Sequence, residues 1–400
     1  YIFENISDDT IISAALSLIE KILSFHEPFS SEVCATSLLK ILFLYHNNVN
    51  SIKSLLHIVD TDSYPASLVI AELRQGDNCT VQSLLELDSP FLELNIKFLS
   101  HFCLYEDMNS LCDFLQDSLL DNIFILLNSN IRPSIRRACL RFLKNAIRNS
   151  VVTELIVYHN QFVSIFLTLP NDLQERILEL QILIIGCAKT QNAHKIVISN
   201  ELMPFVMQGL SFLAKPIENE LNMSIQGNVE MANKDQNEKQ TFCLNLSYTI
   251  VCYSIDVVNF ISANGKEDTD ILHSSGIVEL LWQFLNGKFH FSIMVSSISA
   301  LMTIFVNSQD AQRQNFIDSH FFGLLGDLYS SLPNGKIIQI TDNLLQLIDE
   351  CETKGNQNLI QHIFGTEALM ESFSEVCQLS EEVVANKIRI ILSKAAKEND

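Results

Sequence analysis

Residues 307–329 read NSQDAQRQNFIDSHFFGLLGDLY, and variants of this pattern recur along the chain. The stretch has a polar helix start and then an apolar anchor pair, Phe316 and Ile317. A short polar elbow, Asp318-Ser319-His320, follows the pair. An amphipathic helix is predicted to begin at Phe321, because apolar residues then recur at helical spacing. The pattern predicts two short helices that meet at an elbow.

Related units can be aligned on the apolar anchor. They read ELIVYHNQFVSIFL, KIVISNELMPFVMQGL, DILHSSGIVELLWQFL and NLIQHIFGTEALMESF. The resulting anchors are Leu73, Leu115, Val157, Val197, Leu272, Ile317 and Ile360, spaced 42, 42, 40, 75, 45 and 43 residues apart. Long apolar helices are predicted beside these units over Pro133–Arg148, Asp172–Lys189, Ile293–Val306 and Ile337–Cys351.

A period of about 40–47 residues built from two or three helices is typical of HEAT and armadillo repeats. The order of short helix, elbow, helix, loop and long helix resembles the armadillo unit. The glycine usual at the armadillo elbow stands only at Gly276; the other elbows carry Asn160, Asn200, His320 and Gly365-Thr366. Armadillo, HEAT and mixed helical repeats therefore all stay open, beside an irregular all-α domain. The resemblance implies an all-α, right-handed α-solenoid of about seven to nine repeats.

The domain organisation follows from the anchors. We expect an N-terminal helical cap or irregular repeats over 1–65, armadillo-like repeats over 66–214, a disordered loop inserted within a repeat over 215–240, and further repeats over 241–400. The loop accounts for the long interval and has few large apolar residues. Further helices are predicted over Asp9–Phe25, Ser31–His46 and Ser51–Val59, with Asp9 and Ser31 as N-caps, and a C-terminal helix over Glu381–Lys397. Because the first residue is Tyr1, we expect the chain to be part of a longer protein.

Composition limits the classes of function. The chain carries 47 acidic and 26 basic residues and a net charge of −21, which disfavours nucleic acids and anionic membranes as partners. Its ten cysteines form no CxxC motif, so reduced thiols in a cytoplasmic or nuclear protein are predicted. The most apolar stretch, Phe242–Ala263, contains Asn245, Asp256 and Asn259. We therefore predict a buried core helix and no membrane insertion.

No motif for catalysis, nucleotide binding or metal binding is present, so the sequence predicts no catalytic residue, no metal site, no cofactor and no enzymatic activity. Armadillo proteins of the importin-α type bind basic peptides through repeated Trp and Asn residues on the last helix of each repeat. This chain has one tryptophan, Trp282, in the helix after an elbow, where a core position is expected. Recognition of that type is not predicted.

A basic helix is the sharpest local signal. Arg137, Arg141, Lys144 and Arg148 fall on one helix face, and Arg132 and Arg136 flank them. The opposite stripe consists of Ile135, Ala138, Cys139, Phe142 and Ala146.

Stacked repeats form a long curved surface, so the sequence predicts a non-catalytic scaffold or adaptor that binds partner protein segments along a concave groove. The six basic residues are predicted to dock an acidic or phosphorylated segment there. The alternative for the helix is a solvated face balanced by acidic neighbours. Two other functions stay open: a nucleic-acid or chromatin-associated repeat protein that uses residues 132–148, and a structural or regulatory subunit of a larger complex.

Overall fold

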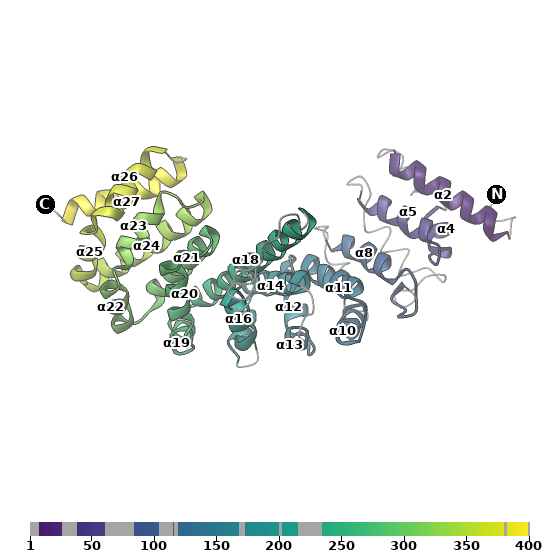
Figure 1. Cartoon of the computed structure of the whole chain (residues 1–400), viewed down its shortest axis with the longest axis horizontal. Coiled ribbons are helices and arrows are strands. Elements are labelled where there is room, and N and C mark those ends of the chain that lie inside the picture. The colour runs from purple at the N-terminus through teal and green to yellow at the C-terminus, as the bar shows by residue number, and fades with distance from the viewer. Residues whose placement is uncertain are drawn as a thin grey trace. The chain divides into compact units, whose positions relative to one another are not determined.

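The computed structural model describes residues 8–25, 38–60, 84–103, 115, 119–167, 173–199, 202–214, 234–379 and 382–398. Within these ranges every regular element is a helix and none is a strand (Figure 1). The predicted all-α class is therefore confirmed. The chain divides into two compact units, Tyr1–Ala193 and His194–Asp400, each of which is described by itself.

The pattern of residues 307–329 forms the predicted pair of helices. Helix α22 covers Asp310–Asp318, and helix α23 covers Phe321–Tyr329. The backbone amide of Gln309 donates to the Gln312 side chain at 2.9 Å, which closes the start of α22. The long helix α24, Asn334–Lys354, follows and packs against the preceding long helix. We call this long helix the third helix of its repeat.

In the first unit, long helices pack side by side in chain order. Helix α2 contacts α5, α5 contacts α8, α8 contacts α11, and α11 contacts α14. The bounds are α2 (Asp9–Phe25), α4 (Leu38–Leu44), α5 (Val49–Asp60), α8 (Leu92–Phe102), α10 (Leu120–Asn128), α11 (Pro133–Ala146), α12 (Ser150–Val157), α13 (Ser164–Leu167) and α14 (Leu173–Lys189). Helix α15 (Gln191–Ile198) spans the boundary between the units.

In the second unit the same arrangement recurs. Third helices α18, α21, α24 and α27 pack in succession, each beside the next (Figure 1). The remaining bounds are α16 (Met203–Leu210), η2 (Ser211–Ala214), α18 (Lys234–Ser262), α19 (Lys266–Ser274), α20 (Ile277–Asn286), α21 (Phe291–Asn307), α25 (Gln357–Phe364), α26 (Glu367–Leu379) and α27 (Glu382–Glu398). Stacked helical repeats of this kind make an α-solenoid.

At two elbows the residue before the second helix of the repeat has a left-handed backbone. Gly276, before α20, has φ 80°, and His320, before α23, has φ 56°. His320 is the one described residue other than glycine with a positive φ. The αL region costs about 1 kcal/mol or more for residues with a Cβ, so glycine is the natural choice there. Gly365, with φ −79°, does not adopt this conformation.

An aromatic cluster joins one repeat to the next. The buried Phe316 ring lies 5.5 Å from the Trp282 ring, 5.4 Å from Phe305 and 5.3 Å from Phe321, between centroids. Trp282 is half-buried and also contacts Phe321 at 5.8 Å. The expectation of a packing role for Trp282 therefore agrees with the structure. Of the anchor pair, Phe316 fills the core, whereas Ile317 is only half-buried.

Second helices also pack closely where a glycine allows it. At Gly326 in α23, a Cβ atom would lie 2.5 Å from the Leu369 amide nitrogen of α26. The Ser372 hydroxyl donates to the Gly326 carbonyl at 2.9 Å across the same contact. The absence of a side chain thus lets adjacent repeats approach to backbone contact.

Three details differ from the sequence-based expectations or lie beyond the described ranges. The N-cap of α2 is Asp8 and not the predicted Asp9, since Asp9 is the first residue of the helix. The carboxylate of Asp8 accepts the capping hydrogen bond from the Thr10 amide. Helix α18 begins at Lys234, inside the stretch assigned to a loop, since Lys, Gln and Glu are good helix formers. The rest of that loop, together with Ser31, Leu73 and Asn200, lies outside the described residues.

One described stretch, Leu244–Ser262 in α18, is long and apolar enough to cross a membrane by length and composition alone. Half of it is buried inside the protein, and α18 packs against α16 and α21. A core helix passes the same test, so this feature is weak evidence for a membrane span.

Candidate partner-binding surface

Helix α11 lies between α8 and α14 in the stack of the first unit (Figure 1). Pro133 occupies its first turn, where the missing amide hydrogen breaks no helical bond. Ala138, Cys139, Phe142 and Ala146 are buried along the predicted apolar stripe. One side of the helix is therefore fixed in the core, and the other side is available to solvent.

The six basic residues of this helix do not share one environment. Arg132, Arg141 and Arg148 are exposed, Arg137 and Lys144 are half-buried, and the Arg136 side chain is only 12% exposed. The structure therefore places five of the six at the solvent side and turns Arg136 inward.

Arg136 joins three helices inside the first unit. Its Nε lies 3.3 Å from Glu175 Oε2, and its Nη2 lies 3.1 Å from Glu179 Oε1, both on α14. Its Nη1 donates to the Leu127 carbonyl of α10 at 2.6 Å, and its Nη2 donates to the Ile165 carbonyl of α13 at 3.2 Å. Carbonyls near a helix end lack partners within their own helix, and a guanidinium can satisfy them. This residue holds neighbouring repeats together.

Glu179 is the most constrained acid of that cluster. Its side chain is fully buried, and Oε2 has no hydrogen-bond partner among the described residues. Arg176 Nη1 lies 3.6 Å from this oxygen. Burial raises the pKa of Glu179 to about 7, although the charges of Arg136 and Arg176 act in the opposite direction. The sequence analysis did not predict this buried ion-pair cluster. Glu175 and Glu179, four residues apart in an otherwise apolar helix, were the pattern that could have indicated it.

Among the described residues, the acid found beside the solvent side of α11 is Glu93, near the beginning of the helix. Hydrogen bonds from Lys97 and Ser134 lower the pKa of Glu93 on α8, and the charges of Lys97 and Arg137 add to this. Arg137 is thus close enough to Glu93 to act on it. Further along the helix, Arg141, Lys144 and Arg148 form no ion pair with any acid in the described part of the chain. That end of the surface keeps its positive charge.

The third helices of the second unit offer a contrast. Lys336 of α24 reaches Asp256 of α18 at 3.3 Å, although α21 lies between these two helices in chain order. The middle helix presents small residues: Ser299 donates to Gln339 of α24, and Thr303 accepts from Asn343, both at 3.0 Å. Burial raises the pKa of Asp256, and Lys336 opposes that effect. The polar groups named here are thus paired with one another across the third helices.

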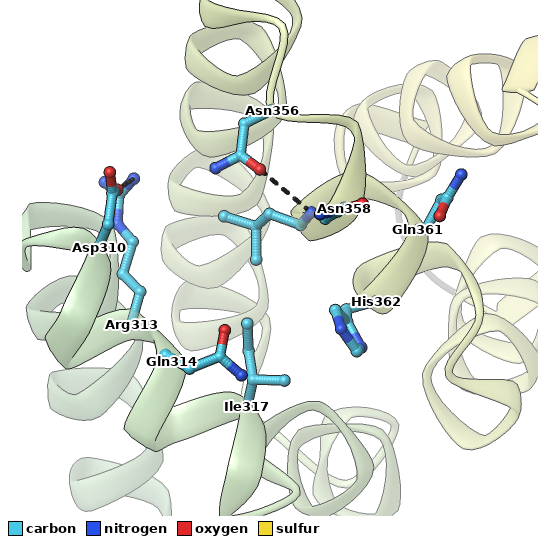
Figure 2. Close-up of a pocket in the computed structure, with 9 residues that line it drawn as sticks. Asp310, Arg313, Gln314, Ile317, Asn356, Asn358, Gln361 and His362 are labelled. Atoms are coloured by element: carbon cyan, nitrogen blue, oxygen red, sulfur yellow. Dashed lines mark hydrogen bonds and ion pairs between the residues drawn. The ribbon is translucent and has the colours of Figure 1, made fainter.

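A separate pocket of about 490 Å³ lies between α22 and α25 in the second unit. Figure 2 shows amide and imidazole groups at its wall, from Gln314, Asn356, Asn358, Gln361 and His362. The Asn356 side chain accepts from the Leu359 amide at 3.4 Å and so caps α25. These groups can hydrogen-bond to a neutral polar group, and they do not select a charged one.

Arg313 is the only guanidinium at this pocket, and its donors are already used. Its side chain is 5% exposed, and Nε donates to the Phe305 carbonyl at 3.1 Å. Nη2 also bonds to the Val306 carbonyl and lies 3.3 Å from Glu350 Oε2. Arg313 therefore satisfies the end of α21, much as Arg136 satisfies the end of α10.

The described residues offer little for covalent or metal chemistry. Burial raises the pKa of Cys139 and Cys187 to about 12, so both thiols are protonated at neutral pH. No group of three His, Cys, Asp or Glu side chains in the described ranges is placed to hold a metal ion. The basic side of α11 is thus the most distinctive polar surface in the described ranges.

Comparison with known proteins agrees with the arrangement of the helices. No protein-family model matches the sequence, and no curated protein sequence matches it. An engineered protein solved by the Northeast Structural Genomics Consortium aligns with a TM-score of 0.59 at 12% identity, covering 98% of this chain and 97% of its own. A designed armadillo repeat protein aligns with a TM-score of 0.50 at 12% identity, covering 67% of this chain and 97% of its own.

The chain has an armadillo-like fold. The armadillo-like fold inferred from residues 307–329 is confirmed. At 12% sequence identity the comparison supports the fold alone and no particular function. In this armadillo-like arrangement, α11 is a third helix, flanked by the third helices α8 and α14. Its basic side belongs to the surface that the stacked third helices form.

Proposed function

We propose that this chain is a non-catalytic scaffold or adaptor that binds segments of partner proteins along its stacked third helices. Stacked repeats present an extended surface that an elongated segment can follow. The chemistry of the described residues supports recognition better than catalysis, since the buried thiols of Cys139 and Cys187 are protonated and the described His, Cys, Asp and Glu side chains form no metal-binding group. The cysteines that the structure describes are free thiols, which favours the cytoplasm or nucleus as the location.

The proposed docking site is the basic side of α11, for an acidic or phosphorylated segment. The carrying observation is a concentration of positive charge on one third helix in a chain whose net charge is −21. Arg132, Arg137, Arg141, Lys144 and Arg148 supply that charge at the solvent side, and Arg136 fixes the helix against α14. Guanidinium groups bind carboxylates and phosphates through paired hydrogen bonds.

The test is charge reversal on this surface. Arg137, Arg141 and Arg148 are replaced by Glu, and binding to immobilised peptides that are acidic, phosphorylated or neutral is measured. The control reverses Lys195, Lys266 and Lys288, three exposed residues outside the third helices, and changes the net charge by the same amount. We expect acidic and phosphorylated peptides to bind the wild type and the control but not the α11 variant. Equal binding by all three folded proteins would remove the proposed site.

Nucleic acid is the main competing ligand for the same residues. Binding to phosphate backbones weakens steeply with salt, because each neutralised phosphate releases counterions. An oligonucleotide that binds through α11 at physiological salt, more tightly than any peptide, would move the chain to the nucleic-acid class.

A second candidate function is that of a subunit packed against another protein through its last helix. Val383 and Ile390 of α27 are 60% and 49% exposed. Two exposed apolar residues on one helix are typical of a face that another helix can cover. Loss of co-purifying protein on Val383→Asp and Ile390→Asp, with binding at α11 unchanged, would favour this function.

A further inference from the structure

The basic residues of α11 fall into two halves with different surroundings. In the first half, Arg136 is paired with Glu175 and Glu179, and the charge of Arg137 acts on Glu93. In the second half, Arg141, Lys144 and Arg148 form no ion pair or hydrogen bond with another described side chain. The two halves therefore have different roles.

Third-helix lysines in the second unit show what pairing looks like in this fold. Lys336 lies 3.3 Å from Asp256, Lys354 lies 2.5 Å from Glu350, and Lys394 lies 2.8 Å from Asp349. Lys387 also pairs, with Asp342. Each of these cations has a carboxylate beside it. Arg389 of α27 bonds to the Asn386 side chain and forms no ion pair, so single cations without a carboxylate also occur, but among the described residues three adjacent ones occur only at this place.

These three cations also act on one another. Arg141 and Lys144 are three residues apart on α11, and Arg148 lies in the turn directly after the helix end at Ala146, close enough for its charge to act on Lys144. Partial burial lowers the pKa of Lys144, and the charges of Arg148 and Arg141 lower it further. Like charges held this close destabilise one another, and a bound anion would remove that repulsion.

We propose that Arg141, Lys144 and Arg148 form a phosphate-binding site that takes a phosphorylated serine or threonine of a partner protein segment. This inference rests on the proposed function and narrows its ligand. A phosphate monoester carries about −1.5 to −2 charges at neutral pH and three acceptor oxygens, whereas a carboxylate carries one charge and two oxygens. Two guanidinium forks and one ammonium match the phosphate in both charge and number of acceptors.

The structure also holds this site in place. Asn145 lies within the same turn and donates to the Ser100 hydroxyl of α8 at 3.0 Å, which joins the two helices. Ala146 and Leu143 are buried on the opposite side of the helix. The backbone that carries the three cations is therefore fixed by packing, and only their side chains need to order when an anion binds.

The test compares three peptides of one sequence, Gly and Ser throughout, that carry two phosphoserines, two glutamates or two serines at the same positions. Fluorescence anisotropy measures their binding to the whole chain at physiological salt. We expect the phosphopeptide to bind about tenfold or more tightly than the glutamate peptide, and the serine peptide not to bind. Replacement of Arg141, Lys144 and Arg148 by Gln is expected to abolish the difference, whereas Gln at Lys195, Lys266 and Lys288 leaves it intact.

Each other outcome overturns the inference in an identifiable way. Equal binding of phosphoserine and glutamate peptides, lost together in the α11 variant, rejects phosphate selectivity and leaves the proposed acidic-segment site standing. Failure of all peptides to bind rejects the phosphate site and the acidic-segment site together. A single-stranded RNA oligonucleotide that competes more strongly than the phosphopeptide reassigns the residues to nucleic acid. Thermal unfolding of every variant is measured as a control, to check that the fold is retained.

Discussion

Replacement of Phe316 by Ala tests whether the aromatic cluster joins adjacent repeats. The ring is 2% exposed and has four ring neighbours from different helices: His273 of α19, Trp282 of α20, Phe305 of α21 and Phe321 of α23. Its removal leaves a cavity where α22 meets the preceding repeat. In a stack of repeats, this contact belongs to the interface between neighbours, and therefore to the cooperativity of the second unit.

The expected cost follows from the burial and the ring contacts. Truncation of a buried Phe to Ala costs about 3–5 kcal/mol, because the transfer free energy of the ring is lost and a cavity is left behind. Aromatic pairs contribute about 0.5–1.5 kcal/mol beyond area, so we expect the upper part of that range, about 4 kcal/mol. For a unit of this size, each kcal/mol corresponds to roughly 2–4 °C, which predicts a Tm lowered by about 8–16 °C.

The chain carries its own probe for this change. Trp282 is the single tryptophan and lies 5.5 Å from the Phe316 ring. Urea unfolding followed by tryptophan fluorescence therefore reports on the interface itself. Phe291→Ala is the matched control, because that ring is 45% exposed and its loss is expected to cost less than about 1 kcal/mol.

The reasoning fails if Phe316→Ala destabilises the second unit no more than Phe291→Ala does. It also fails if the emission of Trp282 in the folded protein is the same in wild type and in Phe316→Ala. Either result would mean that the contacts of the Phe316 ring do not stabilise the packing between these two repeats.

Two further predictions follow from the first unit and from the elbows. Burial raises the pKa of Glu179 from 4.5 to about 7, so the folded state binds more protons than the unfolded state between these two pH values. The free energy of unfolding therefore falls, by up to about 3 kcal/mol, as the pH rises through this window. Thermal unfolding from pH 5 to pH 7.5 should show this slope in the wild type and a flatter one in Glu179→Gln; parallel slopes would contradict it. At the elbows, His320→Gly should raise and Gly276→Ala should lower the free energy of unfolding by about 1 kcal/mol each, because both positions are left-handed. Urea denaturation measures both, and changes of the same sign would show that backbone strain is not the cause.

The helices of this chain were predictable from local pattern. Helix α2 covers the predicted Asp9–Phe25, and α14 begins at Leu173, one residue after its predicted start. Helical spacing of apolar residues and the few glycines and prolines suffice for this, because both act within one element. The predicted loop 215–240 differs from the structure from Lys234 onward, where α18 is already helical. The first residues of α18 are good helix formers but carry no apolar stripe, so hydrophobic periodicity did not predict this part of the helix.

The elbows show a limit of a different kind. The polar elbow at His320 was located correctly, and the expected glycine is absent there. Only coordinates reveal that this histidine accepts the same left-handed backbone as Gly276. A repeat can therefore keep its geometry when its signature residue is lost, at a cost of about 1 kcal/mol that packing must offset.

The candidate site was predictable as a face and not as a set of partners. Arg137 and Arg141 lie on α11 at the spacing of one helix face, whereas α11 ends at Ala146, two residues short of the predicted helix end, and Arg148 lies in the turn that follows. Arg136 was grouped with them because it is adjacent in sequence, yet it points to Glu179, 43 residues away. No local pattern contains that contact, since its acceptor belongs to the next third helix.

The period of the repeats nevertheless predicts where such partners must be sought. Several polar contacts between adjacent third helices join residues 40 to 45 positions apart, as in Ser299–Gln339, Arg136–Glu179 and Asn145–Ser100, although Lys336–Asp256 spans two repeats. Residues one period away from Arg141 and Lys144 lie at 96–104 and 181–189, and neither stretch contains an Asp or Glu. The helices that flank these two cations in the stack therefore have no carboxylate at the right height to neutralise them. Among the described residues no carboxylate neutralises their charge, which is the physical reason to look for the partner of this chain at the second half of α11.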